Sequence, residues 1–489
     1  MHIWTASAAS RLPCETAETW CSNLELVSGS NAIVLRLVIR RLLSLRGLLA
    51  TIWNHRKVIM GVSSNCEIHG RLRRAAFTIS TILVAVVGLA RTSASKPAAA
   101  AQRPKSGKVV LYAAVGAELT QFDVNVQSAT LVKRGSVALP GNIQYAWPHP
   151  SKRYLYVAWS NESTGNQHGM SAFRIDPISG ALRPHGQSVR LPARPIHVTT
   201  DIPGTHLLVS YPFPSGVTVH RLGQDGTIDS QVKQSASLDV GIYTHQMRVD
   251  PSNRMVILAA RGSDPRGDKP EDPGSLKILS YKDGLLTNRA SIAPGGGFGF
   301  GPRHVDFSGP FVFVSLEREN KLLVYKKLAD ETLSSEPLFT KDSLTDPSNV
   351  RPGQAAGTVH VHPSGKFVYQ ANRATGTTNF EGKTVFIGGE NAIAVYAINQ
   401  HTGEPTLIQN IDTRGIRPRT FALDASGRVL VAANQDALLV RDEKGISTVP
   451  ASLAVYRVRD DGTLDFVRKY DVETDGTRSL FWMGLVTLP

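Results

Sequence analysis

Cysteine is nearly absent from this chain. The 489-residue sequence has three cysteines, Cys14, Cys21 and Cys66, and all of them lie within residues 1–108. The rest of the chain therefore has no thiol for a disulfide bond, a thiolate metal ligand or a nucleophile. Catalysis by cysteine is excluded for that part.

Two other motifs of catalysis and cofactor binding are missing as well. No Gly-x-Ser-x-Gly elbow occurs, so a serine mechanism of the α/β-hydrolase type has no support. The glycine run GGGFGFG at 295–301 is not followed by Lys-Ser/Thr, and no helix pattern opens there. We therefore expect this run to form a loop, and we expect no bound cofactor.

Net positive charge is small outside the N-terminal region, although the whole chain has a formal net charge of +14. Residues 1–108 hold 15 of the 54 Lys/Arg and four of the 40 Asp/Glu, which leaves 39 basic and 36 acidic residues. A net charge of +3 over the rest does not favour a nucleic-acid partner.

The N-terminal region has the pattern of an export signal. Residues 71–74 include three arginines, an uncharged run of 16 residues spans 75–90, and small residues follow around Ala94. The alternative is a single-pass anchor, but the run is shorter than the roughly 20 residues that a bilayer requires. We expect a cleaved signal, no stable membrane anchor afterwards, and a periplasmic or secreted protein.

A signal peptide begins at its start codon, so Met60 is a more natural initiator than Met1. Residues 1–59 are then an upstream extension. Residues 60–106 comprise the signal peptide and a flexible Ala/Pro/Ser/Lys linker.

The remainder, 107–487, is predicted to be all-β. Short runs of Val, Ile, Leu, Tyr and Phe alternate with Gly, Pro, Asn and Asp, with almost no helical periodicity. One unit recurs: strand, "D-P-x-G"-like turn, strand, loop, "v-Y-x-h" strand, "dG-L" turn, strand. The clearest copies are HVHPSGKFVYQANR (360–373) with IAVYAINQHTGEPTL (393–407), and FALDASGRVLVAANQ (421–435) with LAVYRVRDDGTLDF (453–466).

Seven such units predict a seven-bladed β-propeller with four-stranded antiparallel blades. The first unit, 109–124, is short, and residues 477–489 form a spare strand that can complete it and close the ring. A β-sandwich is the alternative, which seven near-equal units with one turn chemistry disfavour.

Repeat geometry predicts a site at one mouth of the central channel. In a blade, the start of the innermost strand and the end of the second strand lie on the same face. His245, Arg303 and Arg419 stand six positions before the turns of their units, and second strands end at Glu317 and Arg373. Asn434 and Asn161 occupy matching places. These side chains are expected to converge.

Two interpretations of this cluster remain open. Arg303 and Glu317 belong to one hairpin, so they could form a purely structural ion pair. Several cations around one carboxylate also suit an anionic ligand. His360 is expected to line the channel, whereas His362 precedes a turn and is expected to hydrogen-bond within it rather than bind a metal.

Residues of about 107–487 resemble the seven-bladed lactonase propellers, which include the propeller type of bacterial 6-phosphogluconolactonase and fungal carboxy-cis,cis-muconate cyclase. The motifs that carry the resemblance are GPRHVDF, VSLERENKLLVY, VHPSGKFVYQANR, NAIAVYAINQHTGEPTL and RPRTFALDASGRVLVAANQ. The residues implicated in that family correspond here to His245, Arg303, Glu317 and Arg373. Three insertions, 261–275, 293–302 and 374–390, depart from the family and reshape the mouth.

The resemblance implies a metal-free lactone hydrolase, acting as a monomer on a small lactone. Glu317 would be the base for water and His245 the proton donor, while Arg303, Arg373 and Arg419 bind the substrate anion and the oxyanion. His360 and Asn434 would help to bind the substrate. A muconate-cyclase-like lactonising isomerase and a non-catalytic exported binding propeller are the alternatives. Export favours a non-phosphorylated sugar lactone or another environmental lactone.

Overall fold

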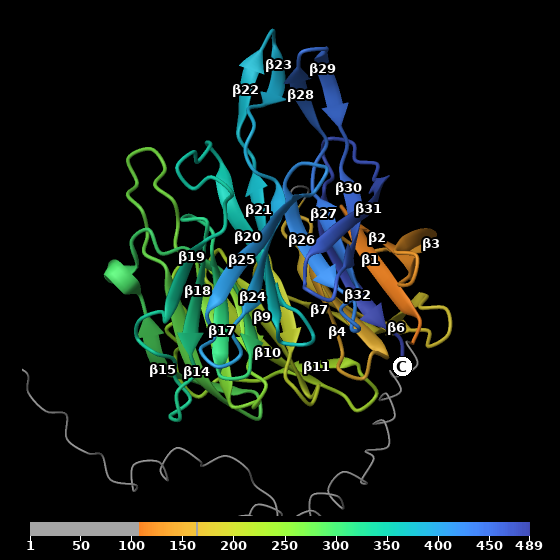
Figure 1. Ribbon diagram of the computed structural model, residues 1–489. Coiled ribbons are helices and arrows are strands. Elements are labelled where there is room, and N and C mark those ends of the chain that lie inside the picture. Colours follow the sequence, from red (N-terminus) through yellow and green to blue (C-terminus); the bar gives the residue numbers. More distant parts are fainter. Residues whose placement is uncertain (1–106, 163–164) are drawn as a thin grey trace, which may run out of the picture. The chain divides into compact units, whose positions relative to one another are not determined.

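Antiparallel sheets of four strands account for nearly all of the regular structure (Figure 1). The structure, a computed structural model, describes residues 107–162 and 165–489. The predicted upstream extension, signal peptide and linker therefore lie outside the described residues. Within the described part, no helix is long and apolar enough to cross a membrane.

Seven of the sheets are the blades of a propeller, numbered here in chain order. Blade 1 contains β32 (Leu480–Thr487), β1 (Val109–Val115), β2 (Glu118–Asn125) and β3 (Thr130–Ala138). Blade 2 contains β4 (Asn142–Pro148), β5 (Tyr154–Ser160), β6 (His168–Ile175) and β7 (Leu182–Arg190). Blade 3 contains β8 (His197–Thr200), β9 (His206–Tyr211), β10 (Gly216–Leu222) and β11 (Ile228–Gln231).

The remaining blades have the same order of strands. Blade 4 contains β12 (Thr244–Val249), β13 (Met255–Ala260), β14 (Ser275–Lys282) and β15 (Leu285–Ile292), and the short 3₁₀ turn η1 (Pro294–Gly297) follows it. Blade 5 contains β16 (Pro302–Ser308), β17 (Phe311–Leu316), β18 (Lys321–Lys326) and β19 (Phe339–Asp342). Blade 6 contains β20 (Gln354–Val361), β21 (Phe367–Ala374), β24 (Ala392–Ile398) and β25 (Pro405–Asp412). Blade 7 contains β26 (Pro418–Leu423), β27 (Val429–Asn434), β30 (Ser452–Val458) and β31 (Leu464–Asp471).

Burial explains why the second strands are continuous apolar runs. In β13, MVILAA, and β17, FVFVSL, every residue is buried, because blades pack face to face and cover both sides of the strand. The fourth strands lie at the rim, so most residues of β7 and β15 are exposed.

Tyrosines tie neighbouring blades together. The Tyr112 hydroxyl of blade 1 donates to the Gly180 carbonyl of blade 2 at 2.6 Å, and Tyr369 of blade 6 donates to Gly462 of blade 7 at 2.9 Å. Both glycines have positive φ in the turn before the fourth strand. The repeated turn glycine thus presents a carbonyl that the preceding blade binds.

His362 hydrogen-bonds within its turn, as the sequence predicted. Its Nδ1 lies 3.1 Å from the N–H of Ser364 and 2.8 Å from that hydroxyl, and Nε2 lies 2.9 Å from the carbonyl of Gly427. His149 makes the same contacts in blade 2.

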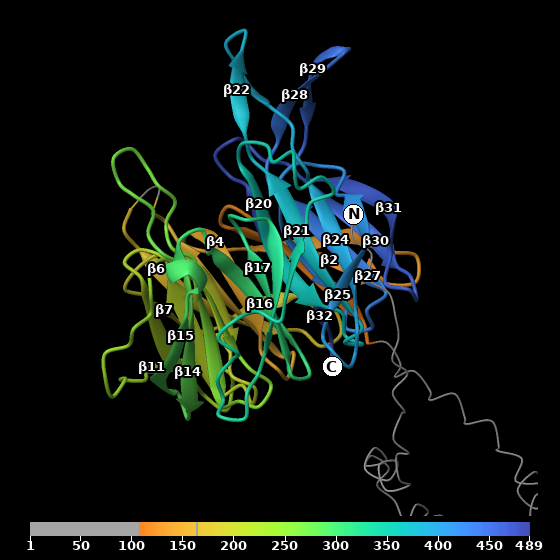
Figure 2. The same ribbon diagram turned by 60° about the vertical axis from the view of Figure 1, so that its left-hand side comes forward.

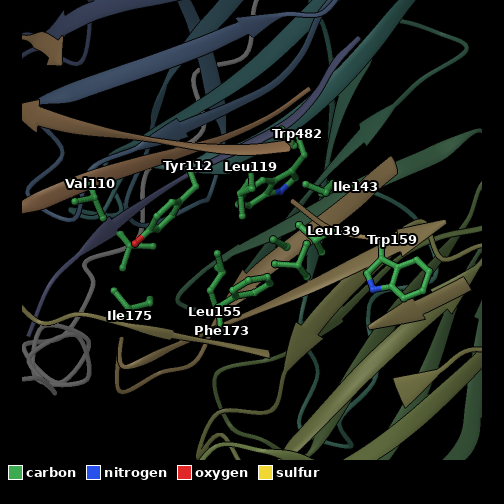
Figure 3. Packing of buried hydrophobic residues seen from close by; sticks show 14 of the residues in the cluster. Val110, Tyr112, Leu119, Leu139, Ile143, Leu155, Trp159, Phe173, Ile175 and Trp482 are labelled. Atoms are coloured by element: carbon green, nitrogen blue, oxygen red, sulfur yellow. The ribbon is translucent and has the colours of Figure 1, made fainter. Parts of the chain in front are cut away.

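The C-terminal strand closes the ring, which confirms the prediction. β32 pairs antiparallel with β1 from Val109–Thr487 to Val115–Leu480 and is the innermost strand of blade 1. Its Trp482 packs into the core between blades 1 and 2, beside Leu119 (Figure 3). The two ends of the propeller therefore share one sheet.

An eighth sheet stands outside the ring. β22 (Thr377–Phe380) and β23 (Lys383–Phe386) are inserted in blade 6, and β28 (Leu438–Asp442) and β29 (Gly445–Val449) in blade 7. The two hairpins join through the parallel pair β23–β28. Both views show this sheet projecting from the blades (Figures 1 and 2). It starts from the ends of β21 and β27, so it belongs to the face where second strands end.

We expect the closing strand β32 to contribute strongly to the free energy of unfolding of the propeller. Trp482→Ala removes a side chain that is 4 % exposed, so we expect the free energy of unfolding to fall by about 3–5 kcal/mol. Phe466→Ala at the rim, where the side chain is 37 % exposed, is the control and should cost less than half of that. Chemical denaturation measures both. Equal losses of unfolding free energy in the two variants would contradict this role of β32.

Candidate active site

Glu317 lies at the centre of a cluster of arginines at one mouth of the channel. It directly follows β17, and its N–H donates to the Gly301 carbonyl at 2.8 Å across the hairpin. Arg303 of the same blade places Nε 2.8 Å from Oε2 of Glu317. Arg373 of blade 6 places Nη2 3.0 Å from Oε1, and Arg261 of blade 4 places Nε 3.1 Å from the same oxygen. One carboxylate thus joins three consecutive blades.

These four side chains are well removed from water. The Arg303 side chain is 1 % exposed, and those of Arg373, Arg261 and Glu317 are 11 %, 12 % and 13 % exposed. Burial alone would raise the pKa of Glu317, but Arg373, Arg261, Arg303 and Arg419 outweigh it and lower that pKa to about 2. The carboxylate is therefore ionised at neutral pH.

Repeat register explains how the cluster forms. The carbonyls of Tyr243, Gly301 and Arg417 accept hydrogen bonds from the residue after each second strand. His245, Arg303 and Arg419 each lie two positions beyond these carbonyls, so the three are structural equivalents, as repeat geometry predicted.

The same register identifies the residue that sequence reasoning missed. The equivalents of Glu317 are Arg261 in blade 4 and Gln435 in blade 7, because each is the first residue after its second strand. Arg261 could have been found by counting from the end of that strand.

Asn434 does not join the cluster. It precedes the equivalent of Glu317 by one residue, and a one-residue step along a strand turns the side chain to the other face. Its Nδ2 donates to the Thr413 carbonyl at 2.8 Å and lies 3.1 Å from the Ser452 hydroxyl, and the residue is 0 % exposed. These bonds join β27 to β30 and to the segment that follows β25.

Arg419 lies near Glu317 without pairing with it. Its Nε donates to the Phe481 carbonyl at 3.2 Å, and its guanidinium lies 3.8 Å from the centre of the Phe481 ring. No ion pair of Arg419 occurs among residues 107–162 and 165–489. Burial and the nearby Arg373 lower the pKa of Arg419 to about 10, so it remains a cation at neutral pH.

His245 is buried beside these arginines, with 4 % of its surface exposed. The centre of its ring lies 6.2 Å from that of Tyr243, to which it is nearly parallel, and 5.1 Å from that of His304. Its Nδ1 has no hydrogen-bond partner in the described part of the chain. Burial, followed by Arg303 and Arg419, holds the pKa of His245 well below its usual value. The imidazole is therefore neutral.

A second layer of side chains lies one position further along the inner strands. The ring centres of His304 in blade 5 and His197 in blade 3 lie 6.3 Å apart. The ring centre of Tyr145 in blade 2 lies 4.3 Å from that of His197. Gln246 accepts a hydrogen bond from the N–H of Val305 at 2.6 Å. His197 and His304 are 0 % and 2 % exposed, so this layer forms a floor beneath the arginines.

His360 belongs to a third layer, away from Glu317. Its Nδ1 lies 3.6 Å from Oδ2 of Asp306, and Asp306 also pairs with Arg248 at 3.1 Å. Burial would raise the pKa of Asp306, but Arg248 and His360 lower it to about 2. His360 thus lines the channel but is separated from the mouth by the His197–His304 layer.

Further charges extend the cluster into the segment 261–275 between β13 and β14, called here the blade 4 insertion. Asp264 pairs with Arg261 at 2.5 Å and with Nε of Arg318 at 2.8 Å, and Arg318 also pairs with Glu271. Glu271 accepts a hydrogen bond from the N–H of Gly299 at 2.7 Å. Positive and negative groups alternate from Glu317 to the loop before blade 5.

The chemical capacity of the mouth follows from these contacts. It presents a fixed carboxylate, an unpaired guanidinium and a neutral imidazole, with further guanidinium groups that can stabilise a developing oxyanion. Within the described residues no group of three or more His, Cys, Asp or Glu side chains could hold a metal ion.

Comparison with known proteins gives concordant matches. The family model "Lactonase, 7-bladed beta-propeller" matches residues 109–441. A 6-phosphogluconolactonase of Bacillus subtilis is 27 % identical over 370 residues, which cover 71 % of this chain and 95 % of the relative. One of Serratia proteamaculans is 23 % identical over 303 residues, covering 61 % and 80 %.

Solved structures share the fold. The periplasmic gluconolactonase of Pseudomonas aeruginosa has a TM-score of 0.60 at 19 % identity, covering 78 % of this chain and 100 % of that one. A 6-phosphogluconolactonase from Bacteroides fragilis, described as putative in its structure, has a TM-score of 0.58 at 17 % identity, covering 78 % and 99 %.

Glu317 should contribute a pH-dependent term to stability. Its pKa falls from 4.5 to about 2 on folding, so its ion pairs stabilise the fold fully above pH 4.5 by about 3 kcal/mol. This contribution should disappear as the pH falls from 4.5 towards 2. We expect the difference in unfolding free energy between the wild type and Glu317→Gln to follow that course in denaturant titrations.

The matched control is Glu443→Gln, which changes an exposed carboxylate in the β28–β29 turn. It should leave stability within about 0.5 kcal/mol at every pH. A Glu317→Gln difference that did not vary between pH 2 and 6 would contradict the ion-pair account.

Proposed function

The chain belongs to the seven-bladed β-propeller lactonase family, and we propose that it hydrolyses the ring ester of a small sugar-type or other anionic lactone at the Glu317 site. The observation that carries the proposal is the pairing of one buried carboxylate with three arginines while Arg419 stays unpaired nearby. A purely structural cluster would be closer to neutral. The excess cation suits an anionic ligand or transition state.

The reaction uses the groups of the mouth as follows. A water oxygen attacks the ring carbonyl carbon, and Glu317 takes a proton of that water. Arg303 and Arg373 stabilise the oxyanion of the tetrahedral intermediate. The ring C–O bond then breaks, the leaving oxygen takes the proton that Glu317 holds, and the product is a hydroxy acid.

The low pKa of Glu317 has a consequence for this mechanism. A carboxylate with a pKa of about 2 is ready to accept a proton but is a weak base. As the oxyanion develops, it shares the guanidinium groups of Arg303 and Arg373 with the carboxylate. Their hold on Glu317 weakens, and its basicity increases in the step that requires it.

His245 acts in the neutral form. Because burial and the arginines disfavour the imidazolium, its N–H stabilises the leaving oxygen as a hydrogen-bond donor while the proton taken up by Glu317 is returned. Glu317 therefore carries the proton, and His245 stabilises the leaving oxygen as a hydrogen-bond donor.

The substrate class follows from charge and compartment. Several relatives carry the name 6-phosphogluconolactonase, and one structural neighbour is a periplasmic gluconolactonase. We propose that residues 60–106 direct export and that residues 1–59 are an upstream extension. A non-phosphorylated aldonolactone, or another lactone of the cell exterior, then fits better than a phosphorylated intermediate of the cytoplasm.

Glu317→Gln should abolish most turnover. The amide keeps the shape but cannot accept the water proton, so we expect kcat to fall by about 10²-fold or more while KM changes little. Acid release from a panel of lactones measures both constants. Arg373→Gln is the companion variant and should raise KM as well as lower kcat.

An active Glu317→Gln enzyme with a lowered melting temperature would assign the carboxylate to architecture alone. Absence of turnover by the wild type on every lactone would favour a binding propeller. Formation of a lactone from an unsaturated acid would favour the cyclase.

Arg419 should discriminate substrates by charge. Arg419→Gln removes the unpaired cation, so we expect KM to rise about 10-fold or more for lactones with a carboxylate or phosphate and to change less than about 3-fold for neutral lactones. Steady-state kinetics on a matched pair, a neutral gluconolactone and its phosphorylated form, provide the comparison. Equal increases for both would remove Arg419 from anion recognition.

A further inference from the structure

We propose that Arg261 is a positioning residue for the reaction: it holds Glu317 ionised and in place from the blade 4 insertion, and it thereby frees Arg373 to bind the substrate. This inference rests on the proposed function of the Glu317 site. It adds a residue that the sequence analysis did not place in the site.

Arg261 and Arg373 share one oxygen of the carboxylate. Both approach Oε1 of Glu317, at 3.1 Å and 3.0 Å, while Arg303 approaches Oε2. If Arg373 moves to a substrate anion, Oε1 keeps a cation only because Arg261 remains. Without Arg261, the same movement would leave Oε1 unpaired in a buried place.

Arg261 is itself fixed from several sides. Its N–H donates to the Tyr243 carbonyl at 2.8 Å, its guanidinium lies 5.1 Å from the Tyr243 ring, and Nη1 donates to the Gly262 carbonyl at 3.1 Å. Asp264 pairs with Nη2 at 2.5 Å. A guanidinium held in this way is preorganised and does not follow the substrate.

The backbone of the insertion is equally constrained. A Cβ on Gly274 would lie 1.7 Å from the Phe300 carbonyl oxygen, and the N–H of Gly274 donates to the Gly297 carbonyl at 2.9 Å. Only glycine permits this approach, which joins the insertion to the glycine-rich loop before blade 5. The Asp264–Arg318–Glu271 contacts reinforce the same junction.

The charged groups around Glu317 now number four, one from each of blades 4 to 7. They are Arg261, Arg303, Arg373 and Arg419. Arg261 differs from the other three because it also pairs with Asp264, which holds it beside Glu317. Replacing Arg261 therefore removes a cation from Glu317 but leaves in place the arginines that are proposed to bind the substrate.

The test compares Arg261→Gln with Arg261→Lys. We expect Arg261→Gln to lower kcat about 10-fold or more with a smaller change in KM, and to move the acid limb of the pH–kcat profile to higher pH. Arg261→Lys keeps the charge, so its acid limb should lie close to the pH at which the wild type has it. Arg266→Gln, an exposed arginine of the same insertion, is the matched control and should behave like the wild type.

A second readout does not depend on turnover. Carboxyl ¹³C NMR of protein labelled at glutamate, with the Glu317 resonance identified through Glu317→Gln, gives the pKa of this group directly. We expect that pKa to be higher in Arg261→Gln than in the wild type and unchanged in Arg266→Gln.

The outcomes separate the two proposals. A wild type without lactone turnover, together with a raised Glu317 pKa in Arg261→Gln, would overturn the proposed function but leave the contact of Arg261 with Glu317 established. An unchanged Glu317 pKa, or a loss of activity that only follows the loss of folded protein with the pH profile intact, would overturn the positioning role.

Discussion

The site depends on one constraint: a single buried carboxylate must offset the charge of several buried guanidinium groups. Arg303, almost completely removed from water, would be strongly destabilising without Glu317, and burial would raise the pKa of Glu317 if its arginines were absent. Each charge is therefore tolerated only because the others are present. The same balance leaves Arg419 without an ion pair in the described part of the chain, and this cation is the basis of the proposed anionic substrate.

The propeller makes this balance possible because it brings the ends of strands from different blades to one ring. Arg261, Arg303 and Arg373 come from three consecutive blades, and the fourth cation rests on Phe481 in the closing strand β32. Stability of the ring and geometry of the site are consequently linked. One position further along the inner strands, the buried imidazole rings of His197 and His304 have their centres 6.3 Å apart.

Segments inserted between strands of blades 4, 6 and 7 surround the cluster at the mouth. The blade 4 insertion supplies Arg261 and Asp264, and the hairpins of blades 6 and 7 combine in a sheet that no single blade could form. All three insertions begin where second strands end. A change in substrate can therefore arise from loops while the carboxylate and its arginines remain.

Sequence by itself determined the seven units, the closing strand and the equivalence of His245, Arg303 and Arg419, because turn chemistry and strand periodicity repeat along the chain. It also determined the turn role of His362. Only the tertiary structure decided which side chains near the mouth meet Glu317. Arg261 points to it, Asn434 faces its own blade, and His360 lies in a deeper layer. A one-residue step along a strand reverses the side to which a side chain points, so such a step decides whether a residue faces the cluster. Contacts between residues of different blades decide the rest.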